Sequence, residues 1–580
     1  MTGSRRPDRT RGRTPALVLV LVLAMMLCGC VSVPSTGPVV EGRPAGEPVP
    51  PPNVAVIPAP PRPDDTPEEI AEGFLTAMAS YEPGYPTARE FLTPQAAATW
   101  DPASGMLVYA AAEGSRRVTE TAGTVRAVLP LEGTVSADGT YTASAPDTTA
   151  TLDLRMEQVD GQWRLATPPA GLVMSAFDFR REFASFSSYF YAPTGDVLVP
   201  DLTYLPVQGN LPTLLVEAVL DGPSTWLAPA VRSAVGPGVT LTSGAVTVSA
   251  TTARVDLTDQ VAAASAQQRE RIAAQLAWTL RQAAGVTEVA LLAEGTPLPL
   301  PSSDTGVVST DAYDFLDPAA VPAGDQLFAV AGGAVVAVRG NSLRQVDGPL
   351  GQPGQYRAVG VNLTGTQAAA VSSDGSAVLR AGLSSESGTV PVLTGTDLST
   401  PSVDRQDRVW AVDRDGRGSQ VLVAGPETAP AVVVPADALD ATRVSRLVVA
   451  PDGVRAAVVY ERDGGSRLAL ALVLVGTDGS LSIGGLRDLQ LEQLPAVDVA
   501  WASATALAAL AGPAEGAQPY LVELADGALS SRGQVDGATS LAASPGQALV
   551  VGTSDGQLLR QDALLEWEPA VTATAPTYPG

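Results

Sequence analysis

Cys30 is the residue whose neighbours most clearly specify a chemical modification. It ends the segment Leu27-Cys28-Gly29-Cys30, which follows an apolar run over residues 16–26 that five arginines precede. A basic region, a short apolar region and small residues before a cut are the parts of an export signal. A cysteine directly after the cut is typical of bacterial lipoprotein signals. We therefore predict cleavage between Gly29 and Cys30, and a Cys30 that carries N-palmitoyl and S-diacylglycerol groups.

The apolar run is shorter than the roughly 20 residues that a helix needs to span a bilayer, so we expect residues 1–29 to be removed as a signal peptide. Several acyl chains on one residue anchor a protein stably, whereas one chain gives only marginal binding. The predicted location is the extracytoplasmic face of the cell membrane, with the lipid as anchor. An ordinary secretory signal with an incidental cysteine is the alternative interpretation.

The residue types that the chain lacks exclude most catalytic chemistry. All 36 basic residues are arginine, histidine is absent, and the two cysteines are Cys28, in the predicted signal, and Cys30. The mature chain therefore has no thiol nucleophile, imidazole base, Schiff-base lysine, or histidine or cysteine metal ligand. Residues 552–556 (Gly-Thr-Ser-Asp-Gly) match the nucleophile-elbow pattern G-x-S-x-G. Without a histidine base we interpret them as a β-turn, and we expect no catalytic residue, metal site or cofactor.

Acidic side chains leave one enzymatic alternative. Glycosidases work with paired Asp and Glu residues. Hydrolysis of cell-wall glycan by carboxylates alone is therefore an alternative function, with its site on the central face of the C-terminal domain. Asp413-Arg414-Asp415-Gly416 has two acids of a calcium-loop pattern but lacks the third early ligand and the terminal glutamate, which favours a hairpin turn. Asp256 and Asp259 have the spacing of a strand end and a turn, so we predict no site there.

The net charge argues against acidic partners. The formal charge is −25, and removal of residues 1–29, which hold five arginines and one aspartate, takes it to −29. Phosphate backbones and anionic lipid head groups repel such a chain. We expect no nucleic-acid partner and no membrane contact apart from the lipid anchor.

The mature chain divides into a tether and three folded segments. Residues 30–65 are rich in proline and poor in large apolar residues, which predicts an extended tether. In the segment 66–200, an N-cap and a proline at Thr66-Pro67 begin a helix over residues 67–80, and strands follow up to about residue 173. Helices followed by a curved antiparallel sheet predict an α+β domain of the NTF2-like or cystatin-like kind.

The segments 201–300 and 301–580 predict a second α+β domain and an all-β propeller. In the first of them, helices over 211–220 and 267–283 enclose short strands, and a last strand covers 286–293. In the second, short strands of Val, Ala and Leu end in tight Asp-Gly turns, for example at 368–375 and 447–453. The unit recurs at intervals close to the roughly 40 to 50 residues of a propeller blade, which predicts about six blades.

With these segments in order, the chain resembles the LpqB family of lipoproteins. The resemblance is carried by the signal that ends at Cys30, by motifs of the first domain, by a GerMN-like module over 201–300, and by the propeller. The motifs are residues 73–75 (Gly-Phe-Leu), 88–93 (Ala-Arg-Glu-Phe-Leu-Thr), Trp100, 161–165 (Gly-Gln-Trp-Arg-Leu), 220–224 (Leu-Asp-Gly-Pro-Ser) and 275–280 (Gln-Leu-Ala-Trp-Thr-Leu).

The resemblance implies an accessory protein of the MtrA–MtrB two-component signal-transduction system. Its partner would be the extracytoplasmic domain of an MtrB-type sensor histidine kinase, and its effect would fall on cell-wall and division control. The family supplies no catalytic residues, so we expect a binding protein and not an enzyme. A protein that binds a small ligand or a cell-wall fragment, in the cone of the first domain or the funnel of the propeller, is a further alternative.

Replacement of Cys30 tests the predicted anchor. The Cys30→Ala variant lacks the acyl acceptor, so we expect it to leave the membrane fraction and to incorporate no palmitate. Cell fractionation combined with labelling by tritiated palmitate measures both effects. Full retention of the variant in membranes, together with an unlabelled wild-type protein, contradicts the assignment.

Overall fold

The computed structural model describes residues 1–3, 58–110, 117–121, 123–320, 326–384, 388–414, 416, 418–426, 430–440, 442–492, 494–513 and 516–580. The predicted signal cleavage site, Cys30 and most of the predicted tether lie outside these residues. The chain divides into one unit of residues 1–53 and a second of residues 54–580, and the second holds the helices and strands below. Among the described helices, none has the length and apolar character needed to cross a membrane.

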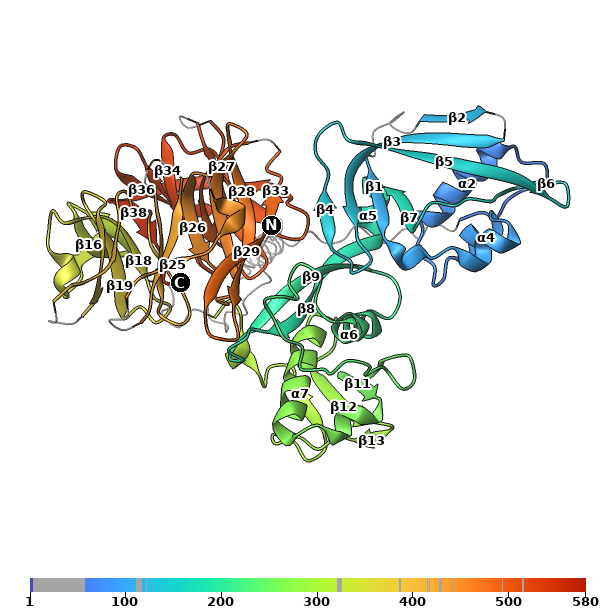
Figure 1. Cartoon of the computed structure of the whole chain (residues 1–580), viewed down its shortest axis with the longest axis horizontal. Helices are drawn as coiled ribbons and strands as arrows, with labels where there is room; N and C mark the ends of the chain where they lie inside the picture. The colour runs from blue at the N-terminus through green and yellow to red at the C-terminus, as the bar shows by residue number, and fades with distance from the viewer. Residues whose placement is uncertain are drawn as a thin grey trace. The chain divides into compact units, whose positions relative to one another are not determined.

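The first domain is α+β, as predicted, and packs short helices against a curved sheet (Figure 1). Helix α2 begins with a reciprocal cap, in which the Thr66 hydroxyl accepts from the Glu69 N–H and the Glu69 carboxylate accepts from the Thr66 N–H. Ile70 and Phe74 of α2 are buried in the domain core. The elements are α2 (Pro67–Met78), α3 (Pro86–Glu90), α4 (Pro94–Thr99), β1 (Met106–Tyr109), β2 (Arg117–Thr121), β3 (Thr124–Val135), β4 (Tyr141–Ala143), β5 (Thr149–Val159), β6 (Gln162–Leu165) and β7 (Leu172–Ser175).

The sheet of the first domain contains one parallel pairing. Its order is β6-β5-β3-β1-β7, with β2 and β4 also paired to β3, and β1 pairs with β7 in parallel. The strands that the sequence predicts, β2 to β6, pair antiparallel as expected, whereas β1 and β7 are not predicted from the sequence. Strand β7 returns to β1 only after the long β3 and β5 strands, so the connection is a crossover and not a hairpin.

A long hairpin follows the first domain. Helix α5 (Ala176–Glu182) runs directly into β8 (Phe183–Tyr191), which pairs with β9 (Leu198–Pro206) along its whole length. Position 200, where the sequence analysis divides the segments 66–200 and 201–300, lies within β9. The hairpin therefore connects the first two domains as one continuous element.

The second domain is α+β with a small mixed sheet of order β10-β11-β12-β13, and β14 also pairs with β12. Its two helices pack against this sheet, and the residues predicted for the apolar face of the longer helix, Ile272, Leu276 and Leu280, are buried. The elements are α6 (Leu211–Asp221), β10 (Thr247–Ser249), β11 (Thr252–Leu257), α7 (Ala266–Leu280), β12 (Glu288–Ala293), β13 (Thr296–Pro297) and β14 (Val307–Ser309).

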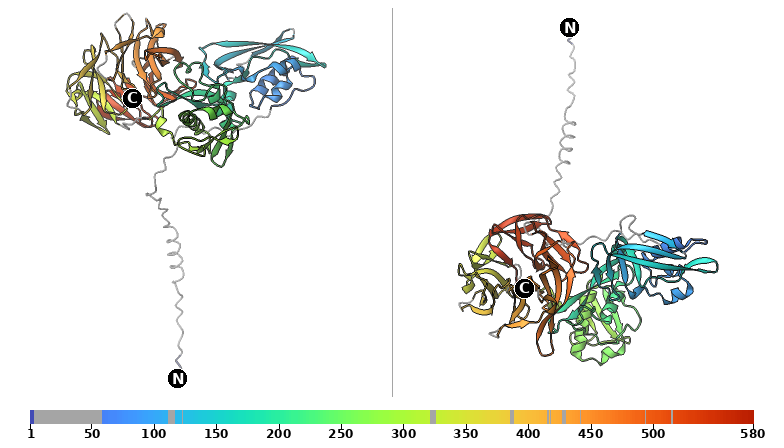
Figure 2. Two further views of the ribbon diagram at one scale, coloured as in Figure 1. Left: turned by 60° about the horizontal axis from the view of Figure 1, so that its bottom comes forward. Right: turned by 45° about the horizontal axis from the view of Figure 1, so that its top comes forward.

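The third domain is the predicted propeller, and its described residues form six four-stranded antiparallel sheets. Figure 2 shows these sheets around a common axis, with the C-terminus inside the ring. The strands are, sheet by sheet, β15 (Leu327–Ala331), β16 (Ala334–Arg339), β17 (Ser342–Gln345) with β38 (Thr574–Thr577); β18 (Tyr356–Val361), β19 (Gln367–Ser372), β20 (Ala377–Gly382), β21 (Val390–Thr394); β22 (Ser402–Val403), β23 (Val409–Asp413), β24 (Gln420–Ala424), β25 (Val432–Val434); β26 (Val444–Val449), β27 (Arg455–Arg462), β28 (Gly465–Val475), β29 (Leu481–Leu489); β30 (Ala496–Trp501), β31 (Ala506–Ala511), β32 (Gln518–Glu523), β33 (Leu529–Ser531); and β34 (Ala538–Ala542), β35 (Val550–Thr553), β36 (Gln557–Ala563), β37 (Glu566–Thr572).

The ring is closed by the C-terminal strand. Strand β38 pairs with β15 and completes the first sheet, although about 240 residues separate the two strands. Beyond β38, the Tyr578 hydroxyl donates to the Ala548 carbonyl of the sixth sheet at 2.9 Å, and the Gly580 N–H donates to the Val361 carbonyl of the second sheet at 2.9 Å. The last residues of the chain thus bond to three sheets.

The propeller also contacts the second domain within the unit 54–580. Phe190 and Val199 of the β8–β9 hairpin share a buried apolar cluster with Val454 and Leu472 of the fourth sheet. The Trp226 indole N–H donates to the Gly485 carbonyl, and the Arg487 guanidinium lies 4.8 Å from the centre of the Trp226 ring. These contacts join the β8–β9 hairpin and Trp226 to the fourth sheet of the propeller.

Deletion of residues 574–580 tests the closure. Without β38, strand β15 loses the partner on its inner edge. We therefore expect the amides of residues 327–331 to exchange with solvent on the order of 100-fold faster, which corresponds to a loss of about 2.7 kcal/mol in protection. Tyr578→Phe removes one hydroxyl bond and should cost only about 1 kcal/mol. Hydrogen exchange followed by mass spectrometry measures both, with strands β26 and β27 as the internal reference. Unchanged protection of β15 in the deletion variant would show that β38 does not hold the ring closed.

Candidate functional site

The residues that match the nucleophile-elbow pattern form the predicted turn. Residues 552–556 connect β35 to β36, Gly556 adopts φ +81°, and its N–H donates to the Thr553 carbonyl at 3.0 Å. The Thr553 hydroxyl donates to the Asp555 carboxylate within the same turn. Ser554 is exposed, and its N–H donates to the Gly537 carbonyl at 2.8 Å. The prediction of a β-turn is confirmed.

The acids of the partial calcium-loop pattern have structural roles. Asp413 ends β23, and its carboxylate accepts the N–H groups of Thr396 and Asp397 at 2.8 and 3.1 Å. Arg414 pairs with Asp397 at 3.1 Å, and Asp415 lies outside the described residues. In the part of the chain that the structure describes, no group of three or more acids, histidines or cysteines is placed to hold a metal ion.

Buried acid–arginine pairs recur in the turns that follow the first strands of the propeller sheets. Asp404 accepts from the Trp410 indole N–H at 2.6 Å and from Arg408 Nε at 2.6 Å, while Asp452 pairs with Arg455 at 2.7 Å. These carboxylates are occupied by structural partners.

The same turns bond to the next sheet of the ring. The Arg455 guanidinium donates to the Ala504 carbonyl at 2.8 Å, and Arg405 donates to the Pro451 carbonyl at 3.3 Å. Asn362, which takes the place of the acid in the second sheet, donates to Asp407 at 2.9 Å. The polar groups of these turns therefore hold neighbouring sheets together.

A glycosidase acid requires a carboxyl with a raised pKa beside a cleft. Burial raises the pKa of Asp498, against the opposing effect of Arg446, and burial raises the pKa of Asp201, against hydrogen bonds from Ser224. Neither carboxyl lines any of the four cavities described below. For these residues the structure supplies no support for the carboxylate-hydrolase alternative.

A small cavity lies beside the C-terminal residues of the propeller. It holds about 30 Å³ and is lined by residues of the inner strands and by residues 576–580. That volume is close to the share of one water molecule.

Two larger cavities lie elsewhere. One of about 490 Å³ lies on the first domain beside Trp100, Arg155 and Glu157, where the last two side chains pair with each other at 2.7 Å. The other, of about 420 Å³, lies near Asp397 and Glu461 at the third and fourth sheets, and arginines pair with both acids. In both cavities, most charged groups already have partners.

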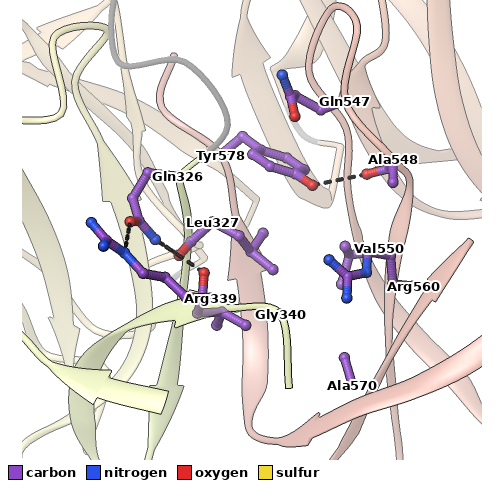
Figure 3. Close-up of a pocket in the computed structure, with 11 residues that line it drawn as sticks. Gln326, Leu327, Arg339, Gly340, Gln547, Ala548, Val550, Arg560, Ala570 and Tyr578 are labelled. Carbon is purple, nitrogen blue, oxygen red and sulfur yellow. Dashed lines mark hydrogen bonds between the residues drawn. The ribbon is translucent and has the colours of Figure 1, made fainter. Parts of the chain in front are cut away.

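A third cavity of about 490 Å³, called here the seam pocket, lies between the first and sixth sheets (Figure 3). The volume is within the range of small-molecule sites. Its lining residues are Gln326, Leu327, Val338, Arg339, Gly340, Gln547, Ala548, Val550, Arg560, Ala570 and Tyr578.

The polar groups of the seam pocket are cationic or neutral. The Gln326 amide donates to the Leu327 and Val338 carbonyls at 2.8 and 3.1 Å, and its oxygen accepts from Arg339 Nε at 3.2 Å. Arg560 reaches the pocket from β36 on the opposite wall. Because arginine stays protonated at physiological pH, the pocket can attract an anion but contains no acid–base pair for catalysis.

None of the seam-pocket arginines is predicted from the sequence as a site residue. They come from strands at the two ends of the propeller, which the closure by β38 brings together. An arginine on a strand carries no local signal that distinguishes a pocket wall from an exposed surface.

Comparison with known proteins assigns each domain. The model "Lipoprotein LpqB, N-terminal domain" matches residues 60–180, "Sporulation and spore germination" matches 187–299, and "Lipoprotein LpqB beta-propeller domain" matches 333–579. Lipoprotein LpqB of Streptomyces coelicolor is 30% identical, over 99% of this chain and 100% of its own length. Lipoprotein LpqB of Thermobifida fusca is 29% identical, over 98% and 99%. That of Mycolicibacterium smegmatis is 29% identical, over 77% and 78%.

Solved structures show weaker likenesses. The tandem GerMN domains of the sporulation protein GerM from Bacillus subtilis are 19% identical with a TM-score of 0.18, over 21% of this chain and 44% of theirs. TolB from Acinetobacter baumannii is 13% identical with a TM-score of 0.35, over 54% of this chain and 85% of its own. The domain assignment rests on the sequence matches and on the strand order.

The buried acids of the propeller turns make a stability prediction. Asp404→Ala leaves the Trp410 N–H and the Arg408 guanidinium without their acceptor, so we expect the propeller to lose about 3 to 5 kcal/mol. Asp478→Ala, at an exposed turn where the carboxylate bonds only to Ser480, is the matched control and should cost less than about 1 kcal/mol. Hydrogen exchange of β23 measures the loss. Equal effects of the two substitutions would contradict a structural role for the buried pair.

Proposed function

Because the chain belongs to the LpqB lipoprotein family, we propose that it is a lipid-anchored extracytoplasmic protein that binds the extracytoplasmic domain of an MtrB-type sensor kinase. Binding would modulate the two-component system that controls cell wall and division. The observation that carries the proposal is the full-length match to LpqB lipoproteins, which covers the three folded domains. The segment that ends at Cys30 supports the anchor.

A binding role agrees with the chemistry of the chain. The sequence contains no histidine or lysine, and its two cysteines lie in the signal segment that ends at Cys30. The motif acids Asp413, Asp404 and Asp452 bond to backbone N–H groups, tryptophan and arginine within the propeller. These contacts supply rigidity, which lowers the entropy cost of presenting a surface to a partner.

The electrostatics limit what the partner surface can be. A formal charge near −29 after signal removal favours a neutral or basic patch on the kinase domain, and that attraction should weaken with salt. A shared membrane raises the effective concentration of both proteins. An intrinsic Kd on the order of micromolar is therefore sufficient.

Direct binding tests the proposal. The protein over residues 58–580 is titrated onto the immobilised extracytoplasmic domain of the MtrB-type kinase from the same organism. We expect a Kd of about 1 to 50 µM, rising severalfold between 0.05 and 0.5 M NaCl because salt screens the attraction. The extracytoplasmic domain of an unrelated sensor kinase is the control.

Two results would count against the proposal. The first is no binding at tens of micromolar together with unchanged phosphorylation of the response regulator in a deletion strain. The second is release of muropeptides when the purified protein is incubated with peptidoglycan, which would favour the hydrolase alternative.

A further inference from the structure

We propose that Leu564 and Leu565, at the tip of the β36–β37 hairpin, insert into an apolar pocket with a basic rim on the extracytoplasmic domain of the kinase. This inference rests on the proposed kinase binding and names the surface that makes the contact. Three observations support it: the exposure of the two side chains, the way their backbone is held, and the charges beside them. Residues 562–566 are called here the hairpin tip.

The two leucines are exposed at a position where the turn does not require apolar residues. Leu564 and Leu565 are 58% and 57% exposed and form the turn between β36 and β37. Turn positions favour residues such as glycine, asparagine and aspartate. Other hairpins of the propeller turn at Asp-Gly pairs, at residues 374–375, 463–464, 478–479, 526–527 and 555–556. The turn alone therefore does not account for the leucines, and their exposure to water is unfavourable.

A second pair of adjacent exposed apolar residues differs in geometry. Val432 and Val433 are each 55% exposed and lie within strand β25. Successive side chains of a strand point to opposite faces, so these two valines do not form one apolar surface. Leu564 and Leu565 instead lie beyond the last residue pair of their hairpin, and a partner that approaches the tip can reach both.

The backbone of the hairpin tip is held by the chain that follows β33. The Gln561 side-chain amide donates to the Leu564 carbonyl at 2.6 Å and to the Arg532 carbonyl at 3.3 Å. The Trp567 indole N–H donates to the same Arg532 carbonyl at 2.7 Å. The next residue is Gly533, where a Cβ atom would overlap a backbone oxygen of the tip. The tip is thus preorganised, which lowers the entropy cost of binding.

Acidic side chains flank the leucines. Asp562 and Glu566 are exposed, and neither carboxylate forms an ion pair with a described arginine. Glu568, further along β37, lies opposite Arg560 in the register, so its charge is partly offset. An apolar pocket rimmed by arginine or lysine therefore complements the hairpin tip in both polarity and charge.

The same acids argue against two other occupants. A carboxylate is costly to bury in an apolar medium, so Asp562 and Glu566 disfavour insertion of the hairpin tip into a bilayer. In a symmetric contact between two copies of the tip, the acids of one copy would face those of the other, and like charges repel. A different protein with basic groups around an apolar pocket avoids both costs.

Kinase binding by tip variants tests the proposal, with the protein over residues 58–580 titrated onto the immobilised kinase domain. In the double variant Leu564→Ser, Leu565→Ser we expect Kd to rise on the order of 30-fold, because the apolar area buried at the interface is lost. The control is the double variant Val432→Thr, Val433→Thr, which makes the other exposed pair more polar and should bind like the wild type.

Charge reversal gives a second readout. Glu566→Arg should raise Kd about fivefold at about 0.05 M NaCl and have little effect at about 0.5 M, because salt screens the contact with a basic rim. Asp304→Arg makes the same change of charge at an exposed position of the second domain and should change Kd less than about twofold. Equal effects of the two substitutions would contradict a basic rim at the hairpin tip.

The outcomes separate this proposal from the proposed function. If the wild type binds the kinase domain and the double serine variant binds equally well, kinase binding stands and the hairpin tip has no part in it. If the wild type does not bind, both proposals fail. Leucine-dependent flotation with vesicles of phosphatidylglycerol and phosphatidylethanolamine, or leucine-dependent dimers in analytical ultracentrifugation, would assign the tip to a membrane or to a second copy and overturn the inference.

Circular dichroism checks the fold of each variant. Should the double serine variant fail to fold, the single variants Leu564→Ala and Leu565→Ala replace it, and each should raise Kd about fivefold. Unchanged binding by both single variants would overturn the proposal.

Discussion

The pairing of β38 with β15 is the contact on which the propeller depends. Without it the first sheet would have three strands and an open inner edge at β15, and here the join consists of one short strand from the end of the chain. The residues after β38 extend this join to the second and sixth sheets through Gly580 and Tyr578. The same segment lines a small cavity among the inner strands and borders the seam pocket.

Arginine carries all the positive charge of this chain, and its geometry shapes the propeller. A guanidinium has five donors in a rigid plane, so it can pair with a carboxylate in its own turn and also reach a carbonyl of the next sheet. Arg455 does both, to Asp452 and to Ala504. Buried pairs of this kind contribute little net stability when intact, but removal of one partner is costly. They act as specific connections between sheets, while apolar strands supply the bulk of the core.

The proposed kinase binding uses the surface and the charge of the folded domains. It would rely on domains that share a buried contact around Trp226 and Leu472, and on the acidic charge of the whole chain. No enzymatic step is needed for such a role.

The sequence by itself determined the local features: the cap at Thr66 and Glu69, the apolar face of α7 and the turn after Thr553. It also determined what chemistry is absent, because a missing residue type cannot be supplied by folding. Only the tertiary structure decided the parallel pairing of β7 with β1, the closure by β38 and the cavity between the first and sixth sheets. Turn and helix signals act between neighbours in sequence, whereas these pairings join segments tens to hundreds of residues apart. Local periodicity predicts that a strand forms. Which other strand it pairs with depends on how the apolar side chains of the whole domain are buried.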